Sequence, residues 1–164
     1  MYERARKGIG YLPQETSIFR KLTVRDNILA VLEFHDDDRG RRENKADEVL
    51  AELGLTARAN SFAYTLSGGE KRRCEIARCL ALDPACVLLD EPFEGLAPTV
   101  VEQLFETFDR LRKEIAIIIV DHNLDLALAL SDTTVALERG QVIYQGASKA
   151  LRDDLDLLRK GLWL

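Results

Sequence analysis

The chain has 164 residues, of which 46% are hydrophobic and 31% charged, and its formal net charge is −5. This length fits one domain or a large part of one. The acidic balance argues against non-specific binding to nucleic acid, because such binding needs a basic surface. The longest apolar stretch, residues 115–120, is far too short to span a bilayer, and the N-terminus has no apolar signal region. We therefore expect a soluble protein that reaches any membrane through a partner.

Turn and capping signals divide the first half of the chain into a strand and two helices. Residues 8–12 predict a short strand that ends at Pro13-Gln14. Thr23 is a suitable N-cap for a helix over residues 24–34, and a second helix over residues 41–53 would stop at Gly54.

The second half alternates between helical and strand patterns. Ser67 and Glu70 have the spacing of a capping box at the start of a helix. The elements expected there are, in order, a helix over residues 67–82, a strand over 86–89, a helix over 98–113, a strand over 115–120, a short helix over 123–130, and a hairpin of residues 133–137 and 141–144.

This alternation predicts the α/β class with a parallel sheet. Residues 20–65 contain no strand pattern, so they are interpreted as a helical insertion between two strands. The runs 86–89 and 115–120 are continuously apolar, a pattern typical of parallel strands buried on both faces. Three cysteines, an odd number without metal-ligand spacing, indicate reduced thiols in the cytosol.

A glycine-bearing helix start stands at Leu66–Glu70, which reads Leu-Ser-Gly-Gly-Glu. Unpaired N–H groups at a helix N-terminus attract phosphate, and the Gly68 and Gly69 positions let an anion approach the backbone. The Ser67 hydroxyl could add a donor. The alternative interpretation is an ordinary capped helix.

An acidic pair, Asp90 and Glu91, follows the apolar run 86–89. A carboxylate at the carboxyl end of a parallel strand can hold Mg²⁺, and the next one can orient an attacking water or accept its proton. The alternative is an acidic pair that caps the following turn.

Two further polar residues follow expected strands. Gln14 could ligate Mg²⁺ through its carbonyl oxygen or simply begin a loop. His122 follows the run 115–120 and could donate to a phosphate oxygen, or be purely structural.

The order of these features resembles the nucleotide-binding domain of ABC transporters over nearly the whole chain. Gln14 matches the Q-loop glutamine, and Leu66–Glu70 matches the signature motif, which in the family binds the γ-phosphate of the nucleotide held by the opposite subunit. Asp90 matches the Walker B aspartate. Glu91 matches the catalytic glutamate and His122 the switch histidine.

The resemblance implies a partial P-loop NTPase fold with a helical subdomain and a C-terminal hairpin. Its implied parts are the Q-loop strand and loop at 1–19, the helical subdomain at 20–65, the remaining core at 66–146 and a helical tail at 147–164. It further implies ATP and Mg²⁺ as ligands, a second nucleotide-binding domain and transmembrane permease subunits as partners, no nucleic acid, and a position on the cytoplasmic face of the inner membrane. Phe19, Arg20 and Lys21 would contribute to permease docking.

Two branches of the family are visible. Residues 8–32 resemble the lipopolysaccharide-export ATPase, whereas residues 94–98 and 123–129 resemble the branched-chain amino-acid and urea importer ATPases. The alternatives are an ABC ATPase that is not part of a transporter, and a catalytically dead module that docks on a permease. The first usually carries a long coiled coil between the Q-loop and the signature, an interval that is short here.

Two departures from the family pattern stand out. Ala97 occupies the position where the D-loop usually has aspartate, and no G-x-x-x-x-G-K-[ST] motif occurs in the 164 residues. That phosphate loop makes most contacts to the β- and γ-phosphates. We therefore expect the chain alone neither to bind ATP tightly nor to hydrolyse it, while its signature helix could still complete the pocket of another subunit.

Overall fold

The computed structural model describes residues 7–153 and divides the chain into two compact units, Met1–Val120 and Asp121–Leu164. The first unit contains a three-stranded sheet and the second a two-stranded sheet. Among the helices of residues 7–153, none has the combination of length and apolar character that a membrane crossing requires.

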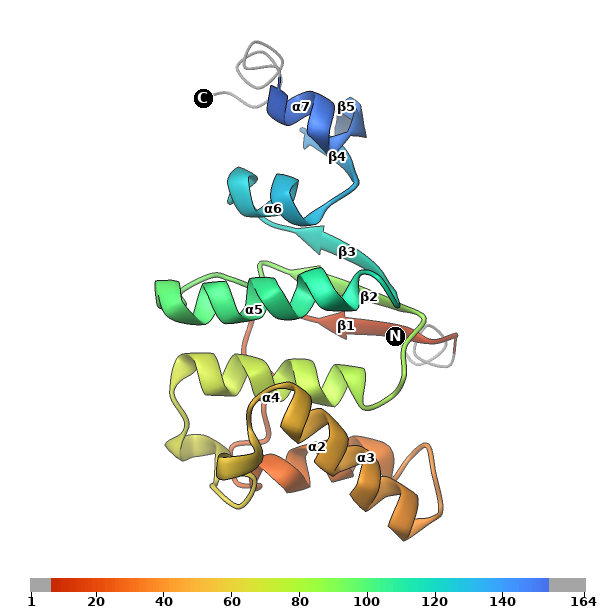
Figure 1. Cartoon of the computed structure of the whole chain (residues 1–164), viewed down its shortest axis with the longest axis vertical. Helices are drawn as coiled ribbons and strands as arrows, with labels where there is room; N and C mark the ends of the chain where they lie inside the picture. The colour runs from red at the N-terminus through yellow and green to blue at the C-terminus, as the bar shows by residue number, and fades with distance from the viewer. Residues whose placement is uncertain (1–6, 154–164) are drawn as a thin grey trace. The chain divides into compact units, whose positions relative to one another are not determined.

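The sheet of the first unit is parallel, as the strand and helix alternation predicts. Its order is β1 (Ile9–Leu12), β2 (Cys86–Asp90) and β3 (Ala116–Val120), with β2 in the centre (Figure 1). Leu12 pairs with Leu89, so segments far apart in the sequence lie side by side. Because the strands are parallel, the residues that follow β1, β2 and β3 leave the sheet at one edge.

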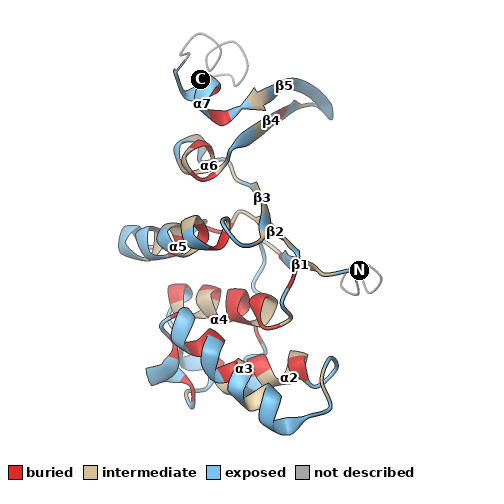
Figure 2. Cartoon of the chain, turned by 45° about the vertical axis from the view of Figure 1, so that its right-hand side comes forward, coloured by how far each residue is buried: buried red, intermediate tan, exposed pale blue. Residues whose placement is uncertain are grey.

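Two helices cover one face of this sheet. Residues from α4 (Gly68–Leu80) and α5 (Pro98–Leu111) gather around Leu12, Val87 and Leu89, which are almost fully buried. Figure 2 shows that buried residues run along α4, whereas the N-terminal turns of α5 are largely exposed.

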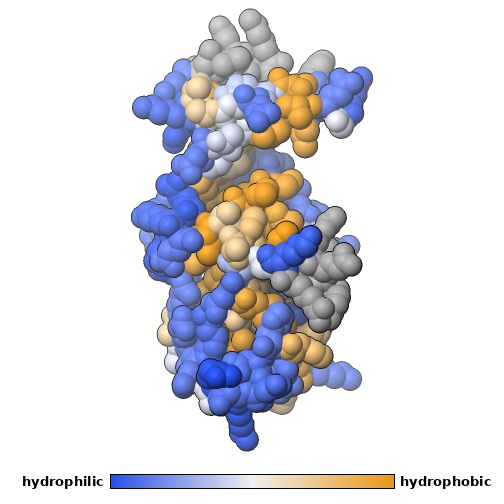
Figure 3. All heavy atoms as spheres, turned by 90° about the vertical axis from the view of Figure 1, so that its right-hand side faces the viewer, coloured by the Kyte–Doolittle hydropathy of each residue, from blue (hydrophilic) through white to orange (hydrophobic). Residues whose placement is uncertain are grey.

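The opposite face of the sheet is open, and here one expectation is wrong. We expected residues 115–120 to form a fully buried strand, but the side chains of Ile118 and Val120 are 54% and 60% exposed. In β2 buried and partly exposed residues alternate. The reason is that α4 and α5 pack on the same face of the sheet, so alternate side chains of β3 meet solvent. Hydrophobic atoms are correspondingly visible at the surface in Figure 3, at the height of the sheet.

The stretch between β1 and α4 is helical, as expected. It contains α2 (Val24–Leu32), α3 (Arg39–Glu52) and the short turns η1 (Thr56–Arg58) and η2 (Ala63–Thr65). The Thr23 hydroxyl caps α2 by accepting the N–H of Asp26 at 3.0 Å. Gly54 has a φ of +64°, which a glycine adopts without strain as the chain leaves α3.

A buried asparagine fixes the segment that enters this helical region. The Asn27 side chain is fully buried and its Oδ1 accepts the Phe19 N–H at 2.8 Å. Its Nδ2 donates to the carbonyls of Phe19 at 3.0 Å and of Thr23 at 2.9 Å. Asn27 thereby replaces the backbone partners that Phe19 would have had in a strand.

The second unit is a hairpin flanked by two helices. Its elements are α6 (Leu124–Leu130), β4 (Thr133–Glu138), β5 (Gln141–Ala147) and α7 (Ser148–Asp153). Arg139 and Gly140 both have positive φ, as a tight two-residue hairpin turn requires. The rest of the expected C-terminal tail, residues 154–164, lies outside the described residues.

We predict that Asn27→Asp lowers the free energy of unfolding by at least about 2 kcal/mol, since it removes two donors and buries a carboxylate against backbone carbonyls. The measurement is chemical denaturation followed by circular dichroism. Asn44→Asp, the same change at an exposed position of α3, is the control and should stay within about 0.5 kcal/mol of the wild type. Equal losses in the two variants would contradict the prediction.

Candidate functional site

The structure brings two of the predicted site residues into contact at the carboxyl edge of the sheet. Gln14 follows β1, and its Nε2 donates to Glu91 Oε2 at 3.1 Å and to Glu94 Oε2 at 2.8 Å. Asp90 is the last residue of β2 and Glu91 the first beyond it. The amide of Gln14 therefore spans the gap between neighbouring strand ends and holds the Glu91 carboxylate.

Tyr11 joins this edge and was missed by the sequence analysis. Its hydroxyl donates to Asp90 Oδ2 at 3.3 Å. The pKa of the Tyr11 phenol is raised, first by loss of solvation and then by the charge and hydrogen bond of Asp90. The signal that could have found it is register: Tyr11 pairs with Leu88, and Asp90 lies two residues further along the same face of β2.

Glu91 has an unusual backbone conformation. Its φ is +43°, in the left-handed region that residues other than glycine rarely adopt. Its N–H donates to the Val120 carbonyl at 2.8 Å, one residue beyond the last register pair of β2 and β3. Conformations of this kind cost on the order of 1–3 kcal/mol and persist where surrounding contacts enforce them, often at functional sites.

The signature segment forms the capping box that the sequence predicts. Ser67 Oγ accepts the Glu70 N–H at 3.3 Å, and Glu70 Oε2 accepts the Ser67 N–H at 2.8 Å. Glu70 Oε1 also accepts from Arg58 Nε at 2.8 Å. These contacts, the Ser67 N–H foremost, lower the pKa of the Glu70 carboxyl, which is thus engaged in shaping the helix start.

The two glycines of the segment differ in their surroundings. A Cβ added at Gly69 would lie 2.7 Å from Val100 Cγ1, so Gly69 is needed for α4 to approach the start of α5. A Cβ at Gly68 would have no heavy atom within 4 Å. The packing of this chain therefore requires glycine at position 69 but leaves open space beside position 68, where an anion could approach the first N–H groups of α4.

The donor set at the sheet edge fits a small divalent cation. Asp90 offers a carboxylate, and Gln14 donates through Nε2 while its carbonyl oxygen is a hard ligand of the type Mg²⁺ accepts. The described residues contain no group of three or more His, Cys, Asp or Glu arranged for a metal ion. Mg²⁺ in nucleotide sites is commonly held by one or two protein oxygens together with water and phosphate.

His122 belongs to the second unit and is exposed. It precedes Asn123, which caps α6 by accepting the Leu126 N–H at 3.2 Å. Asp121 Oδ1 accepts the Asn123 N–H at 2.7 Å, so the residues on either side of His122 are held together. The role expected for His122 stays a prediction.

Three parallel strands, with helices on one face and an acidic pair at the carboxyl edge, place the chain in the α/β class. The family model for the ABC transporter domain matches residues 1–94, and the chain belongs to this family. The expected fold class is thereby confirmed.

Curated relatives cover nearly the whole chain. An uncharacterized ABC transporter ATP-binding protein of Rhizobium meliloti is 47% identical over 97% of this chain and 59% of its own length. The lipopolysaccharide export system ATP-binding protein LptB of Escherichia coli is 42% identical over 94% of this chain and 65% of its own length. The chain therefore spans about three fifths of the length of these relatives.

Solved structures agree in fold. CbiO1 of Clostridium perfringens, described as part of the ABC transporter complex cbiONQ, has a TM-score of 0.85 at 26% identity, over 96% of this chain and 64% of its own. The ATP-binding cassette MJ0796, described as a dimer in a post-hydrolysis state with ADP and phosphate, has a TM-score of 0.79 at 25% identity, over 90% of this chain and 66% of its own.

We predict opposite effects of alanine at the two signature glycines. Gly69→Ala should lower the free energy of unfolding by roughly 1–3 kcal/mol, because the new methyl group overlaps Val100. Gly68→Ala should be neutral or stabilising by up to about 1 kcal/mol, because the space is open and alanine favours the helix. Chemical denaturation measures both, and equal destabilisation by the two changes would contradict the difference in packing.

Proposed function

We propose that this chain supplies the hydrolysis chemistry of an ABC transporter ATPase, with Glu91 as the catalytic residue. The observation that carries the proposal is the contact of Gln14 with Glu91 at the carboxyl edge of the sheet, beside Asp90. Family membership supports it: the family model matches residues 1–94, a range that contains all three residues. Their assignment to the Q-loop, Walker B and catalytic positions is part of the proposal.

Each of these residues has a chemical role in the proposal. Asp90 and the Gln14 carbonyl would hold Mg²⁺, which when bound neutralises charge on the phosphate oxygens. Glu91 orients the attacking water and accepts its proton, while the Gln14 amide keeps the carboxylate in place. For His122 the proposal follows the family resemblance alone, which implies a hydrogen bond from the imidazole to the γ-phosphate.

The signature segment would serve a second subunit. The motif that in the family contacts the nucleotide of the opposite subunit is matched here by Leu66, Ser67, Gly68, Gly69 and Glu70. In support, the open space beside Gly68 is not used by the packing of this chain. Glu70 acts in this proposal by shaping the helix start, since both of its carboxylate oxygens already accept hydrogen bonds. The working form is then a dimer of nucleotide-binding domains.

The same proposal places the dimer on transmembrane permease subunits at the cytoplasmic face of the inner membrane. For the cargo we favour lipopolysaccharide export, which is supported by the 42% identity to LptB. Neither of the two curated relatives described above is named for amino-acid import.

Phe19 is suited to anchor such a partner. Its ring is 45% exposed, yet Asn27 holds its N–H and carbonyl, and the guanidinium carbon of Arg78 lies 4.2 Å from the ring centroid. Phe62 and Tyr64 form a second exposed aromatic feature, a stacked pair. Phe62 forms an isolated bridge with Thr23, and the N–H of Tyr64, in η2, donates to the Arg20 carbonyl at 3.1 Å. An exposed aromatic side chain on a backbone that is already fixed loses little entropy on binding.

We predict that the 164-residue chain alone shows no measurable ATP hydrolysis. We call the chain joined at its N-terminus to a segment that carries the family's phosphate loop the extended protein, and we expect it to hydrolyse ATP with Mg²⁺. In the extended protein Glu91→Gln should reduce kcat at least about 100-fold, because the catalytic base is lost. Phosphate release measures the rate. Glu102→Gln, an exposed position on α5, is the control and should leave kcat unchanged. Persistent inactivity of the extended protein would favour a docking module without catalysis.

We predict that Phe19→Ala lowers capture of the host's transmembrane subunits by the affinity-tagged extended protein at least about tenfold, the loss expected for a central aromatic anchor. Capture from detergent-solubilised membranes is quantified by mass spectrometry. Phe34→Ala removes a ring that is 90% exposed in the turn after α2 and should have no effect. Undiminished capture by Phe19→Ala would count against this docking surface.

A further inference from the structure

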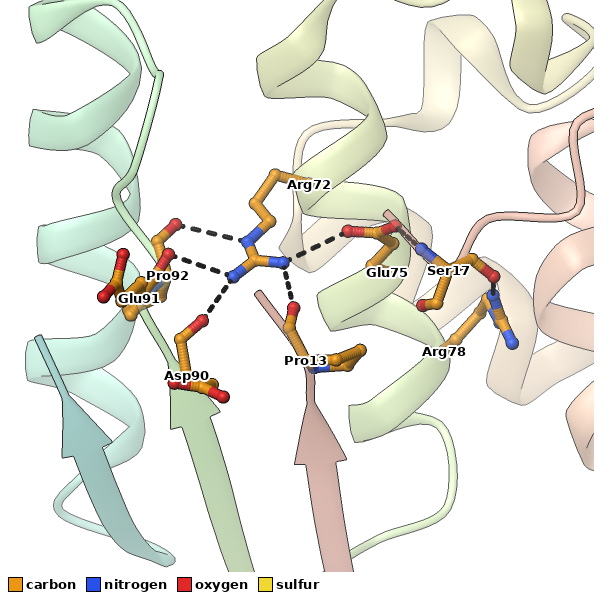
Figure 4. Close-up of polar contacts among 8 residues, drawn as sticks. All are labelled: Pro13, Ser17, Arg72, Glu75, Arg78, Asp90, Glu91 and Pro92. Atoms are coloured by element: carbon orange, nitrogen blue, oxygen red, sulfur yellow. Dashed lines mark hydrogen bonds and ion pairs between the residues drawn. The ribbon is translucent and has the colours of Figure 1, made fainter. Parts of the chain in front are cut away.

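One buried side chain joins the signature helix to both strand ends of the candidate site. The Arg72 guanidinium on α4 donates to the Pro92 carbonyl at 3.3 Å, the Asp90 carbonyl at 3.0 Å and the Glu91 carbonyl at 3.2 Å (Figure 4). On its other side it donates to the Pro13 carbonyl at 2.7 Å and to Glu75 Oε2 at 3.4 Å.

These contacts use the full donor capacity of an arginine. A guanidinium has five N–H groups in a rigid plane, and the structure gives Arg72 five acceptors, four of them backbone carbonyls. The chain leaves the sheet at Pro13 and at Asp90–Pro92. The carbonyls of these residues therefore lie at or beyond the last hydrogen-bonded pairs of the strands. Arg72, which is only 7% exposed, supplies the donors that buried carbonyls need.

Glu75 holds Arg72 in this position. It lies one turn further along α4, is 4% exposed and forms the ion pair with Arg72. Its other oxygen, Oε1, accepts the Ser17 N–H at 2.6 Å, and the Ser17 carbonyl accepts from Arg78 Nη1 at 2.7 Å. The charge of the buried guanidinium is therefore balanced, and its plane is fixed from both sides.

We propose that Arg72 is a positioning residue for catalysis: through the carbonyls of Asp90, Glu91 and Pro92 it keeps Glu91 in its left-handed conformation and so directs the two carboxylates. This rests on the proposed function, because it assigns the geometry that Glu91 needs for its role there. Glu91 is held on its N–H side by Val120 and on its carbonyl side by Arg72. Without the second contact, the strained turn could relax into an ordinary conformation and carry the carboxylate away.

A lysine cannot replace this arrangement. Its ammonium has three donors on a flexible stem and no planar fork, so at most part of the carbonyl set would be satisfied. The hydrogen bonds that Arg72 donates to the acidic turn go to backbone carbonyls. Its loss should therefore affect the rate of the chemical step more than nucleotide affinity.

The experiment compares Arg72→Lys, Glu75→Gln and Arg41→Lys in the extended protein. Arg72→Lys should lower kcat by about 10- to 100-fold, the effect of a small displacement of a reacting group, with KM for ATP changed less than about threefold. Glu75→Gln should give a smaller loss of kcat. Arg41→Lys removes the same kind of fork from an exposed pair with Asp36 and should leave kcat unchanged.

A second readout does not depend on hydrolysis. In the 164-residue chain without nucleotide, Arg72→Lys should raise hydrogen exchange at the amides of Glu91 and Phe93, which flank Pro92, and Arg41→Lys should not. If the wild-type extended protein is inactive but this exchange difference is seen, the proposed function fails while the structural part of the inference stands. Wild-type exchange together with wild-type kcat in Arg72→Lys would overturn the inference. Should Arg72→Lys fail to fold, Glu75→Gln decides by the same two measurements.

Discussion

The structure of the first unit depends on the parallel pairing of β1 with β2. Residues 9–12 lie against residues 86–89, so the long segment between them must leave the sheet and return to it. Closing a flexible loop of this length costs about 4 kcal/mol by chain entropy alone. The segment offsets this cost by folding into α2, α3 and α4 with a core of its own, in which Val24, Ile28, Leu50 and Leu55 are fully buried. The helical insertion thus stabilises the pairing that brings Gln14 beside Glu91.

Two buried polar side chains in this unit form hydrogen bonds with backbone groups that have no partner in a neighbouring strand. Where the backbone leaves the sheet after β1 and β2, it loses ladder partners and would bury unpaired groups. Asn27 supplies both a donor and an acceptor to Phe19, and Arg72 supplies donors to the carbonyls of Pro13 and residues 90–92. Each side chain comes from a helix and fixes a segment of irregular backbone, so the loops near the site are held without regular structure.

Local patterns in the sequence predicted most of the elements, because caps and turns depend on neighbouring residues. Thr23, Ser67 and Glu70 cap helices as expected, and the hairpin turn falls at Arg139-Gly140. Burial was less predictable: the apolar run 115–120 does not reveal that α4 and α5 pack on the same face of the sheet. Arg72 was missed for a related reason. Its partners are carbonyls, which every residue carries, and their position follows only from the folded backbone.

At Glu91, the residue types that would best stabilise the left-handed backbone differ from the one that the proposed chemistry needs. Glycine and asparagine adopt a φ of +43° at lower cost than glutamate, so the substitutions that would relieve strain there are those that remove the carboxylate. Selection for stability alone would drift away from glutamate at this residue. The proposed catalytic role of Glu91 gives a reason for a glutamate in this conformation. It also suggests that consensus or stability-driven engineering of this chain should exclude the position.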